Sequence, residues 1–164
     1  MNRKLAGYTS RFILVHAVVY WIIGGLFYQI SGYEEALDTM EVFELYRPLE
    51  NIVMVAAVFF GQIIRGAVLA LLVYPFHRVF IEKRHGWLLL FGLLFGLMVL
   101  GSPVFIREFL ASAAEIDTIA GFVETCKIGV PEIIAQTLVF SVLFFAWERK
   151  RRRPMQAKWS TGGR

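Results

Sequence analysis

Residues 52–74 read IVMVAAVFFGQIIRGAVLALLVY, a run of 23 residues in which Arg65 is the only charge. As an α-helix this run would rise about 34 Å, which exceeds the roughly 30 Å of a bilayer's hydrocarbon core. A helix is the form expected there, because it satisfies its own backbone hydrogen bonds. The stretch therefore predicts a membrane-spanning helix in an integral membrane protein.

Three further apolar runs, one before this stretch and two after it, make the same prediction. Residues 12–30 and 128–147 are each long enough to cross a bilayer once. The third run is uninterrupted only over 87–100, and its 14 residues would rise about 21 Å. We therefore expect it to extend to residue 105, kinked or capped at Gly101-Ser102-Pro103. The predicted fold is all-α, a four-helix transmembrane bundle with spans at 12–30, 52–74, 87–105 and 128–147.

The composition agrees with a membrane protein and excludes several other classes. The 164 residues are 57% hydrophobic, above the roughly 45–50% of soluble domains. A soluble globule needs more polar residues to cover its surface, and a disordered chain has far fewer apolar ones. Cys126 is the single cysteine, which excludes a disulfide scaffold. Residues 1–164 are therefore predicted to form one integral membrane domain.

The basic residues gather on one side of the predicted membrane. Of the 17, 13 lie in the N-terminal segment, the loop 75–86 and the tail, whereas the other two loops hold 11 of the 13 acidic residues if Glu132, near the outer end of the fourth span, is counted. Because positive residues accumulate on the cytoplasmic side, both termini are predicted to be cytoplasmic, with 148–164 as a basic tail. The expected location is the plasma membrane, in a bacterium the inner membrane. The first apolar run is longer than that of a signal peptide, so we expect it to be retained as an anchor.

The two outer loops contain a helical pattern of their own. In the first loop, apolar residues recur at helical spacing between acidic ones over 33–43, and in the second loop they recur over 105–123. Such amphipathic segments can lie in the plane of the membrane surface. We therefore predict a short interfacial helix in each outer loop.

Arg65 carries the strongest functional signal. An arginine near the middle of a span costs about 2.5–3.5 kcal/mol, so it should face other helices or a wet cavity. Gln62 shares its helix face, and Gln136 of the fourth span lies at a matching depth, with Glu132 one turn further out. We predict a cluster of these four side chains. It could be a set of polar bonds between helices, each worth about 0.6–2 kcal/mol, or a site for a ligand, an ion or an anionic lipid.

A basic run follows the fourth span directly. Basic residues at this position can anchor the topology and can also bind anionic lipid, at about 1 kcal/mol each. Their confinement to one membrane side is not the pattern of a nucleic-acid surface, so the expected partner is the lipid bilayer, including anionic lipid, and no nucleic acid. The predicted lipid-binding residues are Arg149, Lys150, Arg151, Arg152 and Arg153.

The remaining candidate residues give weaker signals. His16, near the inner end of the first span, could serve a proton relay or simply be packed. His77 and His85 lack the spacing of a metal site, and we expect no metal, cofactor or soluble catalytic motif. Gly92 and Gly96 have the spacing of a close helix–helix contact, which could form within the chain or between two copies.

One stretch resembles a known pattern. Residues 63–87 read IIRGAVLALLVYPFHRVFIEKRHGW. This resembles a pattern in small uncharacterised bacterial polytopic membrane proteins. In those proteins an Arg-Gly pair within a span precedes a Tyr-Pro-Phe exit, a basic turn and a Gly-Trp start of the next span. The resemblance implies a multi-pass membrane fold and no known activity.

Three functions fit these features. The first is a non-enzymatic subunit, assembly factor or regulator that contacts a membrane-protein partner. The second is a small oligomeric transporter or channel with Arg65, Gln62 and Gln136 along its route. The third is an intramembrane enzyme acting on lipid, with Glu132 or His16 as the base.

Overall fold

The computed structural model describes residues 3–31, 35, 52–102, 106, 110 and 119–161, and at 54, 119–122, 124, 125, 128 and 153–161 it describes the backbone alone. Every regular element in these residues is helical. The elements are α1 (Arg3–Ile30), α3 (Ile52–Val73), the 3-10 turn η2 (Tyr74–Phe76), α4 (His77–Glu82), α5 (Gly86–Leu100) and α7 (Ile119–Thr161). The two predicted interfacial helices fall largely outside the described residues.

Three helical segments are long and apolar enough to cross a membrane: Arg3–Ile30, Val55–Glu82 and Gly129–Arg152. They contain the predicted spans 12–30 and 128–147 and most of 52–74. The fourth apolar helix, α5, has 15 residues and ends at Leu100, where the Gly101 N–H donates to the Leu97 carbonyl at 2.9 Å. Its predicted extension to residue 105 falls on 103–105, which lie outside the described residues. In the residues that it describes, the structure thus confirms an all-helical architecture with three span-length helices.

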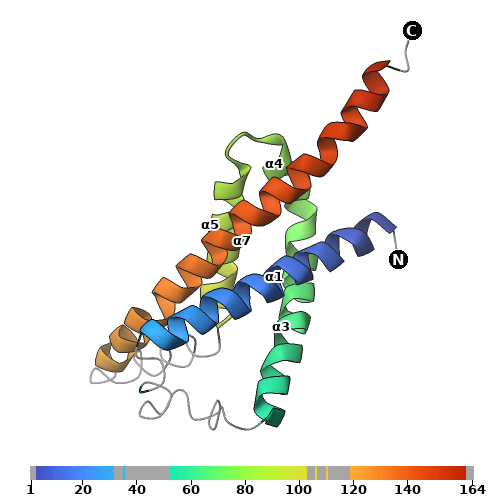
Figure 1. The fold of residues 1–164 in the computed structure, drawn as a ribbon. Coiled ribbons are helices and arrows are strands. Elements are labelled where there is room, and N and C mark those ends of the chain that lie inside the picture. Colours follow the sequence, from blue (N-terminus) through green and yellow to red (C-terminus); the bar gives the residue numbers. More distant parts are fainter. Residues whose placement is uncertain are drawn as a thin grey trace.

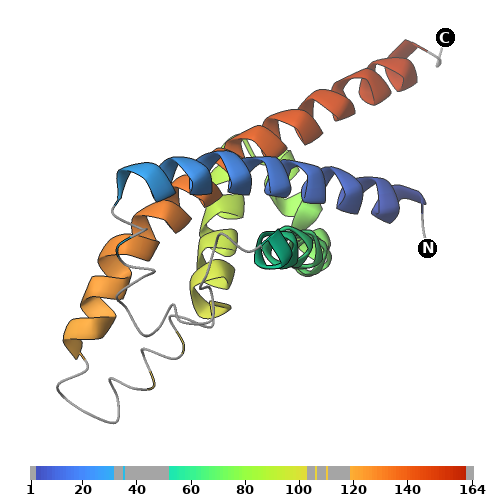
Figure 2. The ribbon, with the colours of Figure 1, turned by 60° about the horizontal axis from the view of Figure 1, so that its bottom comes forward.

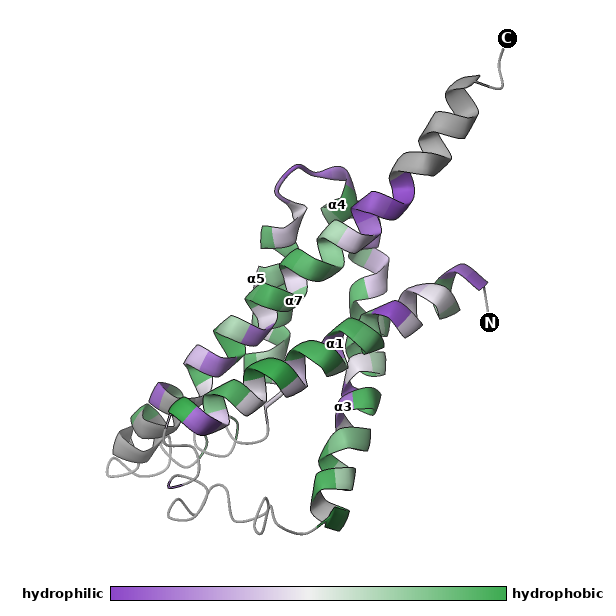
Figure 3. Cartoon of the chain, in the orientation of Figure 1, coloured by the Kyte–Doolittle hydropathy of each residue, from purple (hydrophilic) through white to green (hydrophobic). Residues whose placement is uncertain are grey.

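Helix α1 packs against two other long helices, α3 and α7, and α5 packs against α7 (Figures 1 and 2). The buried residues of α1 share one face, and the opposite face, with Leu14 and Ile22, is exposed. The N-terminal end of α1, the helix α4 and the C-terminal half of α7 lie at the same end of the molecule (Figure 1). We call this the α4 end. Hydrophilic residues gather at this end, and the middle parts of the helices are mostly apolar (Figure 3).

The core between α1 and α7 is aromatic. The Phe12 ring lies 4.6 Å from the Phe140 ring and 5.1 Å from the Phe144 ring, and the Tyr8 ring lies 5.4 Å from Phe144. Lipid tails are as apolar as these side chains, so close packing rather than escape from water holds such helices together in a membrane. Offset and edge-to-face ring pairs add about 0.5–1.5 kcal/mol each to that packing.

The turn from α4 into α5 depends on close backbone contact. The short helix α4 continues the course of α3 beyond Pro75, the chain reverses at 83–85, and Gly86 begins α5 (Figure 1). A Cβ atom at Gly86 would overlap the backbone carbonyl of Phe80. Only glycine lets the two backbones approach this closely.

Candidate functional site

A buried carboxylate connects three helices at the α4 end. Glu148 of α7 is 5% exposed. The Arg11 Nε of α1 donates to Glu148 Oε1 at 2.5 Å, and the His77 Nε2 of α4 lies 3.2 Å from Oε2. Arg151, one turn along α7, lies 3.9 Å from Oε1. We call the set Arg11, His77 and Glu148 the Glu148 clasp.

Both oxygens of this carboxylate are occupied by neighbouring nitrogens. The Tyr8 ring covers the clasp from α1, with its centroid 4.9 Å from that of His77. The Tyr8 hydroxyl is buried and has no hydrogen-bond partner among the described residues. A carboxylate held on both oxygens has little freedom to take a proton from a substrate, whereas it strongly fixes the groups that it binds. The clasp is therefore built to hold α1, α4 and α7 together.

Sequence reasoning missed the clasp, although one signal was present. Among the charged residues of the basic side, only Glu82 and Glu148 are acidic. The structure pairs both of them: Glu148 in the clasp, and Glu82 with Arg152 at 3.7 Å. An acidic residue that breaks a one-sided charge pattern next to a span indicates a partner, and each of these two has one.

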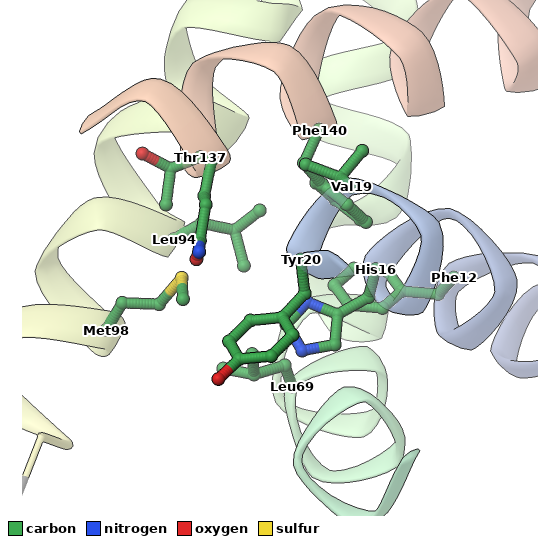
Figure 4. Close-up of a pocket in the computed structure, with 10 residues that line it drawn as sticks. Phe12, His16, Val19, Tyr20, Leu69, Leu94, Met98, Thr137 and Phe140 are labelled. Atoms are coloured by element: carbon green, nitrogen blue, oxygen red, sulfur yellow. The ribbon is translucent and has the colours of Figure 1, made fainter. Parts of the chain in front are cut away.

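A second set of polar side chains lines a small cavity between the apolar helices (Figure 4). The polar side chains that line it are His16, Tyr20, Gln136 and Thr137. The cavity volume is about 10 Å³, close to the minimum that one water molecule requires. In this conformation the space is far too small for a transported solute.

His16 fills a notch in α3. It is 6% exposed, and a Cβ atom at Gly66 would lie 3.0 Å from its Cδ2. Gln62 faces the same ring and Arg65 is close enough to interact with it electrostatically. Neither His16 Nε2 nor Gln62 Oε1 completes a hydrogen bond with the described residues. The histidine that we expected to be packed or to relay protons is thus buried between α1 and α3.

The structure brings two of the four predicted residues into direct contact. The Gln136 Nε2 donates to Glu132 Oε1 at 2.7 Å, and this pair lies against α1 at Gly24, where a Cβ atom would be 3.3 Å from Glu132 Oε1. Gln62 and Arg65 of α3 both lie beside His16. Arg65 and Glu132 each have a further interaction. A direct contact of Gln62 or Arg65 with the Glu132–Gln136 pair stays a prediction.

The predicted lipid-binding residues point in different directions. Arg149 lies over the Phe145 ring, 5.7 Å from its centroid, and Arg152 reaches Glu82 of α4. Lys150 and Arg151 line a shallow open depression together with Ala146 and Trp147. Arg153 lies in the helical backbone of α7, beyond the described side chains. The basic run is therefore divided among several faces of the helix.

The glycine pair of α5 is open. A Cβ atom at Gly92 or at Gly96 would meet nothing within 4 Å among the described residues. The spacing that suggested a close contact within the chain or between copies is not used within the described part of the chain. This face can accept another helix without displacing an existing neighbour.

The described residues contain no group of three or more His, Cys, Asp or Glu side chains able to hold a metal ion. The chain matches no protein-family model, no curated protein and no solved structure at a significant level.

Proposed function

We propose that the protein is a multi-pass membrane protein that acts as a non-enzymatic subunit, assembly factor or regulator. It binds another membrane protein through α5. The observation that carries the proposal is the open face at Gly92 and Gly96. Small residues four apart let two helix backbones approach closely, which is the main source of helix association in lipid. Leu88 and Leu89, 48% and 45% exposed, extend this face with apolar surface.

Two further observations favour this function over transport and lipid chemistry. The central cavity of about 10 Å³ offers no route for a solute. The best-built polar group, the Glu148 clasp, holds its carboxylate on both oxygens and so favours structure over proton transfer.

The proposed role of the α5 face is tested by replacing its glycines with larger residues. We expect the double variant Gly92→Leu/Gly96→Leu to reduce the fraction of protein found in a larger complex at least about tenfold, as measured by native mass spectrometry of solubilised membranes. The variant should fold normally, because a Cβ atom at either position meets no described neighbour within 4 Å. A complex whose mass is a multiple of 18.8 kDa would identify the partner as further copies of the chain.

Gly25→Leu is the matched control. A Cβ atom at Gly25 in α1 also meets nothing within 4 Å among the described residues, but Gly25 lies on a different helix. It should leave the complex intact. Equal loss of the complex in Gly25→Leu, or an intact complex in the α5 variant, would refute the assignment of this face.

The orientation that we propose places the α4 end in the cytoplasm of a bacterial inner membrane. Cys126, the single cysteine, then lies outside, and a membrane-impermeant maleimide should label it in intact cells. Burial raises the pKa of the Cys126 thiol, so the reactive thiolate is scarcer at neutral pH and labelling should speed up as pH rises.

A relocated cysteine provides the control for this orientation. In the variant Cys126→Ser/Lys83→Cys the thiol moves to the exposed turn at the α4 end. It should be labelled only after the cells are permeabilised. The opposite pattern for the two proteins would invert the proposed orientation.

A further inference from the structure

The C-terminal half of α7 has a small surface site of mixed character. A shallow open depression is lined by Ala146, Trp147, Lys150 and Arg151. These positions share one face of the helix, because residues four apart lie one above the other. The apolar pair comes first along the chain, and the basic pair follows about one turn, or 5 Å, later.

The two basic side chains of this depression keep their charge available. In the described part of the chain no carboxylate lies within ion-pair distance of Lys150. Arg151 is 50% exposed and lies 3.9 Å from Glu148 Oε1. Glu148 itself is 6% exposed and already bound by Arg11 and His77, so its negative charge is largely satisfied away from the surface.

This order of chemistry matches an anionic phospholipid at a membrane surface. Tryptophan prefers the level of the headgroups, where its ring meets the acyl and glycerol region. Trp147 is 38% exposed at the point where the apolar part of α7 gives way to the basic run. Lysine and arginine one turn further out then lie at the level of the phosphate.

We propose that Ala146, Trp147, Lys150 and Arg151 form a discrete binding site for the phosphate headgroup of an anionic phospholipid. Lys150 and Arg151 bind the phosphate, and Trp147 with Ala146 contacts the glycerol and upper acyl chain. Arg149 and Arg152 do not belong to the site, because they are directed at Phe145 and Glu82.

The experiment measures binding of dioleoyl phosphatidylglycerol to the detergent-solubilised full chain by native mass spectrometry. Neutralising both site residues in Lys150→Gln/Arg151→Gln should weaken binding about 30-fold. The matched control Arg149→Gln/Arg152→Gln removes the same charge from other faces of the helix and should bind within about threefold of the unmodified protein. Loss of the exposed Arg152–Glu82 pair should have little effect on folding.

Three outcomes would overturn the site. If the control weakens binding as much as the site variant, the attraction is diffuse charge and no discrete site exists. If the site variant binds like the unmodified protein, Lys150 and Arg151 are not the ligands. If dioleoyl phosphatidylcholine binds as tightly, or millimolar inorganic phosphate removes the lipid completely, recognition does not depend on an anionic lipid as a whole.

Discussion

Glu148→Gln is expected to lower the free energy of unfolding by about 3 kcal/mol. The substitution keeps the shape of the side chain but removes the negative charge that Arg11 and His77 share. Removing one partner from a buried ion pair leaves the remaining cation poorly compensated, which typically costs about 3–5 kcal/mol. Arg11 and His77 are 19% and 18% exposed, so water relieves part of that cost. Reversible unfolding in bicelles measures the difference.

Glu82→Gln is the matched control for the Glu148 clasp. It removes the other acidic residue of the α4 end, whose side chain is 65% exposed and pairs with Arg152. An exposed pair of this kind contributes about 0–1 kcal/mol. Similar losses in the two variants would show that burial of Glu148 has no special energetic role. The triple variant Arg11→Leu/His77→Leu/Glu148→Leu should recover much of the stability, because an apolar replacement of a whole buried charged group is often neutral.

Gly86→Ala is expected to destabilise the fold by about 3 kcal/mol or more. Alanine is ordinarily the better helix former by about 1 kcal/mol, so propensity alone predicts a gain. Here the added Cβ overlaps the backbone carbonyl of Phe80, and a backbone cannot rotate away as the end of a side chain can. The turn must therefore open and α5 must shift against α7. The same unfolding measurement in bicelles reports the loss.

Gly92→Ala makes the comparison for Gly86 within one helix. Its Cβ would meet nothing within 4 Å among the described residues, so the propensity gain should appear and stability should stay equal or rise. If Gly86→Ala proves as stable as the unmodified protein, the close approach of α4 and α5 is not required. If Gly86→Ala does not accumulate in the membrane, Gly86→Ser should not accumulate either, because serine carries the same Cβ atom.

The spans could be predicted from the sequence because they depend on local composition. A long run without charges has one stable form in a bilayer wherever its neighbours lie, and three of the predicted runs lie within span-length helices. The end of α5 could be predicted in part. The helix ends at Leu100, directly before the predicted cap at Gly101-Ser102-Pro103, and the extension over 103–105 lies outside the described residues.

The contacts between helices could not be predicted in the same way. Residues four apart share a face of a helix, so the proximity of Glu132 and Gln136 could be predicted, and the structure shows their hydrogen bond. Rotation of one helix about its axis relative to another depends on packing across the whole interface. That rotation decides that His16 faces Gly66, and that Arg11 and His77 meet Glu148. No local pattern in the sequence predicts this rotation.

Two glycines of the stretch 63–87 have a structural explanation that the sequence alone did not provide. As sequence, its Arg-Gly pair and its Gly-Trp start were features of a resemblance. In the structure, Gly66 makes room for the His16 ring and Gly86 makes room for the Phe80 carbonyl. Both glycines are therefore explained by close approach, and neither explanation depends on an activity.

The Glu148 clasp has a consequence for the order in which the protein is made. Arg11 and Glu148 are 137 residues apart, so at about 5–20 residues per second the ribosome needs about 7–27 s to pass from one to the other. In the second half of that interval α1 and α4 are already synthesised, whereas the carboxylate that binds them both has not been made. The joining of α1, α4 and α7 at the Glu148 clasp is therefore a late event in biogenesis, whereas the packing of α1 against α3 at Gly66 does not have to wait for it.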